Sequence, residues 1–153
     1  MRREKKAVNI LVSACLLGVP CRYDGRSVPC EAVVKAAQRG VHLIPFCSEI
    51  YGGLPTPRTP AERVGESVVN RDGVDVTAQY RRGAEEALRL CRLFHCAHAI
   101  LKEKSPSCGS GRVYDGTFTG TLTDSDGVTA ALLKANGIEV IGETQAAAFL
   151  KTP

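Results

Sequence analysis

The stretch ILVSACLLGVPCRYDG, residues 10–25, joins an apolar run to two cysteines. With the residues before it, the run reads VNILVSA at 8–14 and lacks the polar alternation of a half-buried strand, which predicts a strand buried on both faces. Cys15 and Cys21 follow where this strand is expected to end. Two thiols at that place suit core packing, a disulfide, a redox pair or a metal site, and the rest of the chain must decide between them.

Further strands and helices alternate along the chain. Strands are expected at 41–46, 97–103 and 138–141. Helices are expected after Pro29, from an N-cap at Thr77 through 78–94, at 127–136, and at the C-terminus. Asp-Gly pairs at 72–73 and 115–116 predict turns, the first of them a hairpin turn between SVVN and VDVT.

This alternation predicts the α/β fold class. We expect a single domain over residues 1–153, with an open, mostly parallel sheet, helices on both faces (Rossmann-like), and inserted hairpin and loop segments. A length of 153 residues suits one domain with a proper core. The basic start MRREKK predicts a flexible tail over residues 1–7.

Composition excludes several functional classes. A net charge of +4, an aromatic content of 5% and the absence of Trp argue against a large nucleic-acid surface. No apolar run approaches the length of a membrane span, and the apolar run behind Arg2-Arg3 is too short for a signal peptide. We therefore expect a cytoplasmic protein with a small-molecule substrate and no membrane partner; its oligomeric state stays open.

Three of the seven cysteines are placed to form a site. An odd number of cysteines without a secretory signal favours metal-binding or catalytic thiols over a disulfide framework. Cys15 follows the first predicted strand, Cys47 the second, and Cys108 lies a few residues past the third. Ligands of open parallel sheets bind at the carboxyl ends of the strands. We therefore expect these three thiols to converge at one edge of the sheet.

The other cysteines and the histidines receive plainer interpretations. Cys30, Cys91 and Cys96 are expected to be structural, because buried cysteine often serves as a small apolar residue. Cys21 stays undecided between a fourth ligand, a nearby reactive thiol and a part of the loop wall. The three histidines are expected in the core or on the surface and not as ligands.

Three motifs carry a resemblance to a known family. They are SACLLGVPCRYDG at 13–25, FCSEIYGGLPTPR at 46–58 and KSPSCGSGRVYDGTFTG at 104–120. Together they resemble the DUF523 family, over a region from about Ile10 to Ile141. The family usually has Cys-Pro-Glu where this chain has Cys47-Ser48-Glu49, and the loss of proline is expected to loosen this loop while both chemically interesting residues remain.

The resemblance implies a cofactor and an activity. Family desulfurases hold a [4Fe-4S] cluster by three cysteines, which on this sequence are Cys15, Cys47 and Cys108, with Glu49 and Ser105 beside the open iron. The implied reaction is the non-redox desulfuration of a thiolated pyrimidine, 2-thiouracil to uracil and hydrosulfide, in which the open iron captures the substrate sulfur. Glu49 would move protons and Ser105 would relay or orient one. The substrate could be a free base, a nucleoside or another thiolated compound.

An alternative function belongs to another class. The chain could be a non-catalytic metal-binding or thiol redox-sensing module, in which Cys15 and Cys21 cycle between dithiol and disulfide. Glu49 separates the two hypotheses, because a sensor needs no acid–base group beside its thiols.

Several residues also have structural interpretations. Glu49 could cap a helix or pair with Arg58, and Ser105 could only stabilise its turn. Gly52 and Gly53 are expected to allow close backbone approach to substrate or cluster, although a simple turn would look the same. The helix start at 126–127 could offer N–H groups to an anionic or carbonyl ligand.

Overall fold

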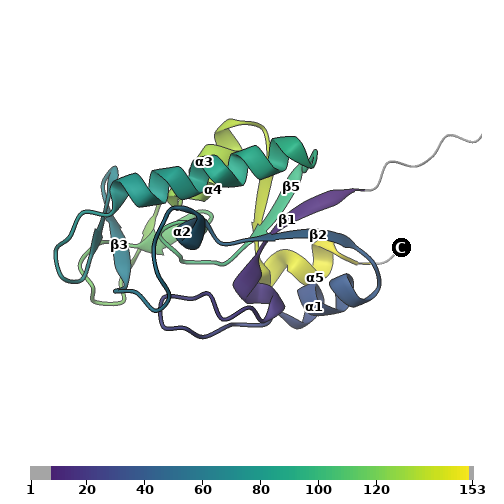
Figure 1. Cartoon of the computed structure of the whole chain (residues 1–153), viewed down its shortest axis with the longest axis horizontal. Coiled ribbons are helices and arrows are strands. Elements are labelled where there is room, and N and C mark those ends of the chain that lie inside the picture. Colours follow the sequence, from purple (N-terminus) through teal and green to yellow (C-terminus); the bar gives the residue numbers. More distant parts are fainter. Residues whose placement is uncertain (1–7, 152–153) are drawn as a thin grey trace, which may run out of the picture.

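Four parallel strands form the central sheet of the protein (Figure 1). The structure is a computed structural model, and it describes residues 8–151. The strands lie in the order β2-β1-β5-β8 and all three neighbouring pairs are parallel, with bounds β1 (Asn9–Ser13), β2 (His42–Phe46), β5 (His98–Leu101) and β8 (Glu139–Gly142). The expected parallel sheet is confirmed, whereas the expected basic tail at 1–7 lies outside the described residues.

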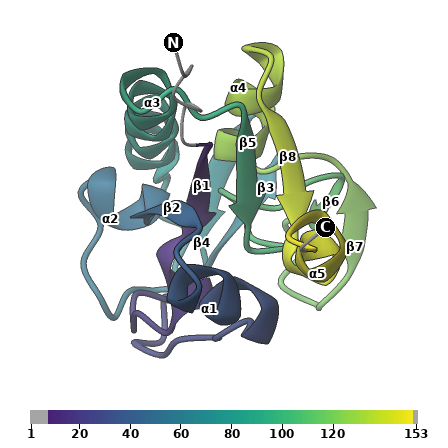
Figure 2. The same ribbon diagram turned by 90° about the vertical axis from the view of Figure 1, so that its right-hand side faces the viewer.

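Helices cover both faces of this sheet (Figure 2). One face packs against α3 (Thr77–Leu93) and α4 (Val128–Ala135), and the other against α1 (Glu31–Gln38) and α5 (Ala146–Phe149). The short 3-10 segments Ala14–Leu17 and Glu143–Gln145 follow β1 and β8. The predicted two-sided α/β architecture is therefore confirmed. Within residues 8–151, no helix has the length and apolarity needed to cross a membrane.

β1 is buried on both faces, as its apolar run predicts. Leu11 belongs to the core under α3 and α4, whereas Ile10 and Val12 belong to the core under α1 and α5. Successive side chains of a strand point to opposite faces, so an unbroken apolar run supplies both cores at once. This pattern places β1 inside the sheet and not at its edge.

Two small antiparallel hairpins lie beyond the central sheet: β3 (Ala61–Val64) with β4 (Ser67–Asn70), and β6 (Arg112–Tyr114) with β7 (Leu122–Asp124). The expected hairpin across the Asp-Gly turn at 72–73 is reduced to a single bridge between Val69 and Asp75. The extended pairing is instead the β3–β4 hairpin, one turn earlier in the chain. The chain after Asp75 leaves the ladder because it begins α3.

Two helix starts differ from the sequence prediction. Thr77 is the first residue of α3 and Val76 is its N-cap. The backbone N–H of Thr77 donates to Asp75 Oδ1 over 2.8 Å, while Thr77 Oγ1 accepts the N–H of Val68 over 2.9 Å. Thr77 therefore ties α3 to β4 and does not cap the helix. Similarly, α1 has Cys30 as its N-cap and Pro29 precedes the helix.

The short helix α2 (Ser48–Tyr51) packs backbone to backbone against α3. A Cβ on Gly52 would lie 2.0 Å from the carbonyl oxygen of Gln79, and a Cβ on Gly83 would lie 1.9 Å from that of Ser48. Only glycine permits this approach from either helix. The expectation that Gly52 allows close approach to substrate or cluster is wrong, because the backbone it approaches is that of α3.

This contact predicts that Gly83→Ala destabilises the protein. Helix propensity alone predicts the opposite, because alanine is better than glycine by about 1 kcal/mol in a helix interior. The added methyl group must displace the backbone of Ser48, and overpacking of this kind costs roughly 1–3 kcal/mol. Urea unfolding measures the change, with Glu85→Ala on the exposed side of α3 as the control expected to change little. A rise in stability for Gly83→Ala would contradict the close contact.

Candidate active site

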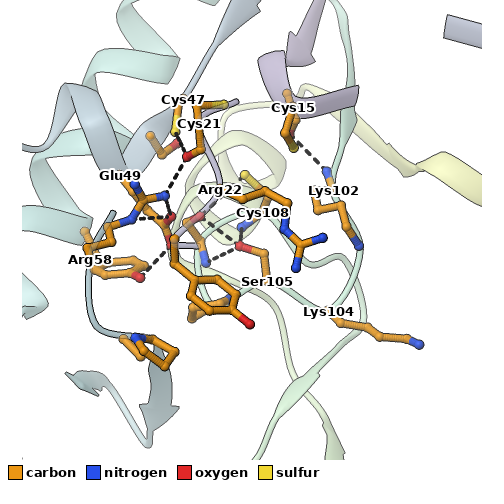
Figure 3. A pocket seen from close by; sticks show the side chains of 18 of the residues that line it. Cys15, Cys21, Arg22, Cys47, Glu49, Arg58, Lys102, Lys104, Ser105 and Cys108 are labelled. Carbon is orange, nitrogen blue, oxygen red and sulfur yellow. Dashed lines mark hydrogen bonds and ion pairs between the residues drawn. The ribbon is translucent and has the colours of Figure 1, made fainter. Parts of the chain in front are cut away.

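A pocket of about 470 Å³ lies where the strands of the central sheet end (Figure 3). Four cysteines line it: Cys15, Cys21, Cys47 and Cys108. The structure thus brings the three cysteines singled out in the sequence into one place, and Cys21 joins them. Their role as metal ligands stays a prediction. Cys91 and Cys96 lie in the core under α3, as expected of structural cysteines.

The strand register explains why the thiols meet. Ser13 of β1 pairs with Phe46 of β2 at the last rung of that ladder, so the segments carrying Cys15 and Cys47 leave adjacent strands side by side. Cys15 lies in the 3-10 segment after β1, and Cys47 is the N-cap of α2. Cys108 arrives from the loop after β5, the other neighbour of β1.

The N-terminus of α4 holds the loop that carries Cys108. The N–H of Val128 donates to the carbonyl of Pro106 over 2.9 Å, and the N–H of Thr129 donates to that of Ser107 over 2.8 Å. The first amides of a helix lack partners within the helix, so they are available to bind such a loop. The expectation that this helix start serves a ligand is therefore wrong, because the chain's own carbonyls occupy these amides.

Ser105 shapes the same loop. Its Oγ accepts the backbone N–H groups of Ser107 and Cys108, each over 3.2 Å, and lies 3.0 Å from Ser107 Oγ. Ser107 Oγ in turn donates to Cys108 Sγ over 3.5 Å. Ser105 therefore stabilises its turn, as one of its two interpretations predicted. Ser105 also lines the pocket, which leaves a chemical role open to test.

Burial and neighbouring thiols keep three of the cysteines protonated. Burial raises the pKa of Cys108 to about 12. Contact with Cys21 and then burial raise the pKa of Cys47 far above its usual range, while contact with Cys15 raises the pKa of Cys21. A metal must therefore displace protons to bind here. Within residues 8–151, no three Cys, His, Asp or Glu side chains stand close enough together to hold a single metal ion.

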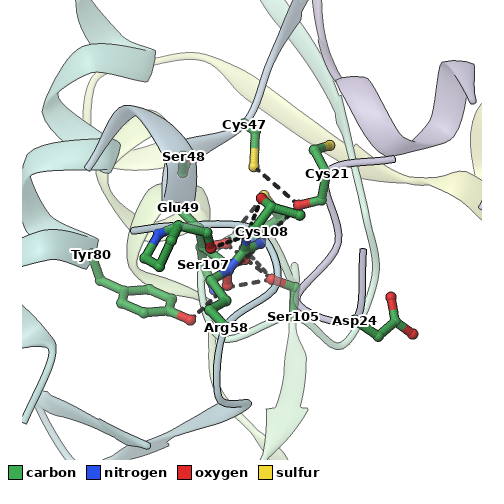
Figure 4. A network of polar contacts seen from close by, with 12 residues as sticks. Cys21, Asp24, Cys47, Ser48, Glu49, Arg58, Tyr80, Ser105, Ser107 and Cys108 are labelled. Carbon is green, nitrogen blue, oxygen red and sulfur yellow. Dashed lines mark hydrogen bonds and ion pairs between the residues drawn. The ribbon is translucent and has the colours of Figure 1, made fainter. Parts of the chain in front are cut away.

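Glu49 forms a buried ion pair beside the thiols (Figure 4). Arg58 donates to Glu49 Oε2 from Nε over 3.0 Å and again from a terminal nitrogen, and the Tyr80 hydroxyl donates to Oε1 over 2.6 Å. The Glu49 side chain is 14% exposed and that of Arg58 is 5% exposed. The expectation that Glu49 could pair with Arg58 is therefore met, and the pair is inside the pocket wall.

Burial and the neighbouring charges shift the pKa values of Arg58 and Tyr80 in this group. Burial alone would lower the pKa of Arg58, but the Glu49 carboxylate beside it outweighs burial, so the net shift is upward. Burial and then the charge of Glu49 raise the pKa of Tyr80 well above its usual value. Tyr80 therefore stays a hydrogen-bond donor, and Glu49 Oε1 stays an acceptor.

Arg58 also connects separate parts of the pocket. Its guanidinium donates to the carbonyl of Cys21 over 2.9 Å, to Thr56 Oγ1 over 3.0 Å and to the carbonyl of Pro55 over 3.2 Å. The thiol of Cys47 lies 3.8 Å from the same Cys21 carbonyl. One buried cation thus joins α2, the Cys21 loop and the segment after α2.

Ser48 anchors α2 at the position where the resemblance led us to expect proline. Its side chain is buried, and its Oγ lies 2.7 Å from Thr129 Oγ1 of α4. The expectation that the loss of proline loosens this loop stays a prediction. The hydrogen bond that Ser48 forms across two helices is a restraint on α2 that a proline side chain could not supply.

Basic side chains surround the thiols. Arg22, Lys102 and Lys104 line the pocket, and two of them are paired with carboxylates: Arg22 with Asp24 over 3.6 Å and Lys102 with Glu143 over 3.2 Å. Positive charge around a cleft favours thiolates and anionic ligands inside it.

Sequence reasoning missed several residues of this pocket. Tyr80 comes from the first turn of α3, and Arg71 and Phe118 come from the segments around the two small hairpins. Phe118 lies within the third motif, between two glycines, which was the available signal for it. Nothing in the sequence marked Tyr80, whose spacing along α3 is that of an ordinary core residue.

Known proteins resemble this chain over most of its length. Residues 10–145 match the family model for 2-thiouracil desulfurase. The uncharacterized protein YbbK of Bacillus subtilis (strain 168) is 42% identical over 146 residues, which are 89% of this chain and 96% of YbbK. The solved structure of TudS, a [4Fe-4S]-dependent thiouracil desulfidase, is 51% identical with a TM-score of 0.85, covering 90% of this chain and 92% of TudS.

The family match begins at the second residue of β1 and includes the other three strands of the central sheet and every cysteine of the pocket. The TM-score of 0.85 shows that the single α/β domain described above is also the fold of TudS. With the motifs, the fold and the pocket in agreement, this chain belongs to the 2-thiouracil desulfurase (DUF523) family.

Proposed function

We propose that this protein is a [4Fe-4S]-dependent desulfurase that converts 2-thiouracil and water to uracil and hydrosulfide, without net electron transfer. The observation that carries the proposal is the meeting of Cys15, Cys47 and Cys108 in one pocket beside the buried carboxylate of Glu49. The likeness to TudS supports both the cofactor and the substrate.

The donor set of the pocket fits an iron–sulfur cluster. Thiolates are the ligands that such clusters prefer, and Cys15, Cys47 and Cys108 would hold it from three separate segments. Because these thiols surround a cavity and do not meet at one point, they suit a cluster better than a single ion. When bound, a cluster with three protein ligands supplies one open, sulfur-preferring iron as a Lewis acid.

Glu49 is assigned the proton transfer. Arg58 occupies Oε2, so Oε1 is the oxygen that can accept a proton from the water that attacks the substrate carbon. The hydrogen bond from Tyr80 fixes the position of that oxygen. The Oγ of Ser105 accepts two backbone N–H groups and lies 3.0 Å from Ser107 Oγ, so its O–H would donate to the substrate ring by exchanging that contact with Ser107 for one with the substrate.

The same proposal includes the protein's setting. The whole chain would act as one iron–sulfur domain in the reducing cytoplasm, where its free thiols persist. Its partner would be a small thiolated nucleobase and not a large nucleic acid. The second candidate, a thiol redox-sensing module, draws support from the contact between Cys15 and Cys21. It gives no role to the network around Glu49, so we prefer the desulfurase.

Anaerobically reconstituted protein should be brown, with about four irons and four sulfides per chain, and should release sulfide from 2-thiouracil without a reductant. Iron and sulfide analysis and a colorimetric sulfide assay measure both properties. A colourless protein with one bound zinc and no affinity for iron would contradict the cluster. An absolute need for an electron donor would contradict the hydrolytic reaction.

Each of the three single variants Cys15→Ala, Cys47→Ala and Cys108→Ala should lose most of the iron, because a three-thiolate site has no spare ligand. Cys91→Ala is the control, since this buried thiol lies in the core and should cost stability without loss of iron. Iron content after reconstitution is the measurement. If Cys21→Ala empties the site and Cys15→Ala does not, the ligand assignment is wrong although the cluster exists.

Glu49→Gln should lower turnover by roughly two to four orders of magnitude, the usual scale for loss of general acid–base catalysis. It should also destabilise the protein by about 3 kcal/mol, because it leaves Arg58 buried without its counter-charge. The double variant Glu49→Gln/Arg58→Met removes both charges and should regain much of the stability but none of the turnover.

Turnover per bound cluster is compared between the wild type, Glu49→Gln and the double variant, at a temperature well below all three melting temperatures. If the double variant recovers both stability and turnover, Glu49 serves only the ion pair and does not carry the proton.

A further inference from the structure

The backbone of Phe118 is held in an unfavourable conformation at the pocket. Its φ of +57° lies in the left-handed region, which phenylalanine rarely adopts. Within residues 8–151 the other non-glycine residues there are His95 and Lys104. His95 follows the end of α3, where helices commonly terminate in this way. Lys104 and Phe118 both line the pocket, and strained residues of this kind cluster at functional sites.

A buried carboxylate holds the loop that presents Phe118. Glu62 of β3 is 8% exposed, and its Oε1 accepts the N–H groups of Gly116 and Phe118 over 3.0 and 3.1 Å. A Cβ on Gly116 would lie 2.7 Å from the carbonyl oxygen of Arg63, so the loop rests directly on β3. The N–H of Asp115 also donates to the carbonyl of Thr121 over 2.9 Å. The loop at 115–121 is therefore held by Glu62 through its backbone N–H groups and by a hydrogen bond that joins its two ends.

Arg71 completes this part of the pocket wall. Its guanidinium carbon lies 5.7 Å from the centre of the Phe118 ring, within the range of a cation–π contact, and both residues line the pocket. They come from the segments around the two small hairpins, whereas the cysteines come from the ends of the central strands. The pocket therefore has one wall of thiols and another that carries an aromatic face.

We propose that Phe118 is the platform on which the planar pyrimidine ring of the substrate stacks, and that the 115–121 loop sets specificity for planar heterocycles. The inference rests on the proposed function. Glu49 and Ser105 offer polar contacts to the edge of a ring, but a flat ring also needs a partner for its face. An aromatic side chain provides such a partner for any base.

Two of the other aromatic residues that line the pocket are less suited. Tyr80 is 2% exposed and its hydroxyl is engaged with Glu49, so its ring is part of the core. Tyr23 is 42% exposed and lies in an irregular segment. Phe118 combines a place in the pocket wall with a backbone that is held rigidly, and a rigid platform loses little entropy when a ligand binds.

The test compares ring and non-ring side chains at position 118 in anaerobically reconstituted protein. Phe118→Leu keeps an apolar side chain but removes the aromatic face, whereas Phe118→Tyr keeps that face. The KM for 2-thiouracil and, by calorimetry, the Kd of the unreactive product uracil are measured together with iron content. Phe118→Leu should weaken both constants by roughly 5- to 150-fold at unchanged iron content, with a much smaller change in kcat. Phe118→Tyr should stay near the wild type.

Two further variants separate stacking from support of the loop. Phe118→Gly suits the left-handed backbone, so the melting temperature should fall little while uracil binding weakens as in Phe118→Leu. A lower melting temperature with an unchanged Kd would show that Phe118 only supports the loop. Tyr23→Leu changes an aromatic residue of the same pocket and should leave the Kd unchanged. Loss of binding there, with normal binding in Phe118→Leu, would overturn the proposal.

The readouts also separate this proposal from the proposed function. If the wild type binds uracil but releases no sulfide, the desulfurase assignment fails, and the Kd values of the Phe118 variants still decide the stacking. If the wild type releases sulfide and Phe118→Leu keeps both constants, the desulfurase stands and the stacking is wrong. A wild type that binds no uracil overturns the stacking directly.

Discussion

The burial of β1 on both faces is the constraint on which the rest of the structure depends. Ile10 and Val12 require cover from α1 and α5, while Leu11 requires cover from α3 and α4. A strand covered on both faces takes parallel neighbours, whose crossover helices provide that cover. Parallel neighbours end at a common edge, so the segments after β1, β2 and β5 meet there. The pocket of thiols is thus a consequence of how the central strand is buried.

Within this frame, a buried ion pair fixes the positions of the chemical groups. Arg58 binds Glu49 and the carbonyl of Cys21 at once, so the carboxylate and one cysteine loop cannot move apart independently. Buried ion pairs are weak evidence for stability, because desolvation of the two charges offsets much of their attraction. This pair acts mainly through position, because it holds the Glu49 carboxyl group beside the thiols of the pocket.

The backbone contacts around the pocket show how closely stability and function are joined here. Gly83 lets α3 touch α2, which carries Glu49, and the first amides of α4 hold the loop of Cys108. Gly116 lets the Phe118 loop lie on β3. In each case the close approach is between two parts of the protein and not toward a ligand. Substitutions at these positions therefore act on the site by moving its supports.

The sequence by itself determined the sheet, its two helical layers and the convergence of Cys15, Cys47 and Cys108. Hydrophobic patterns and the alternation of strands and helices can both be read along the chain without knowing any long-range contact. Its motifs also singled out Glu49 and Ser105. Helix starts at Thr77 and Pro29 were misplaced: Thr77 is already inside α3 with its N–H bound by Asp75, and α1 begins only after Cys30. Only the tertiary structure placed Tyr80 and Phe118 in the pocket and gave Gly52 and Ser48 their partners. These contacts join residues far apart in the sequence, and their geometry depends on how the helices and hairpins pack after the strands have paired.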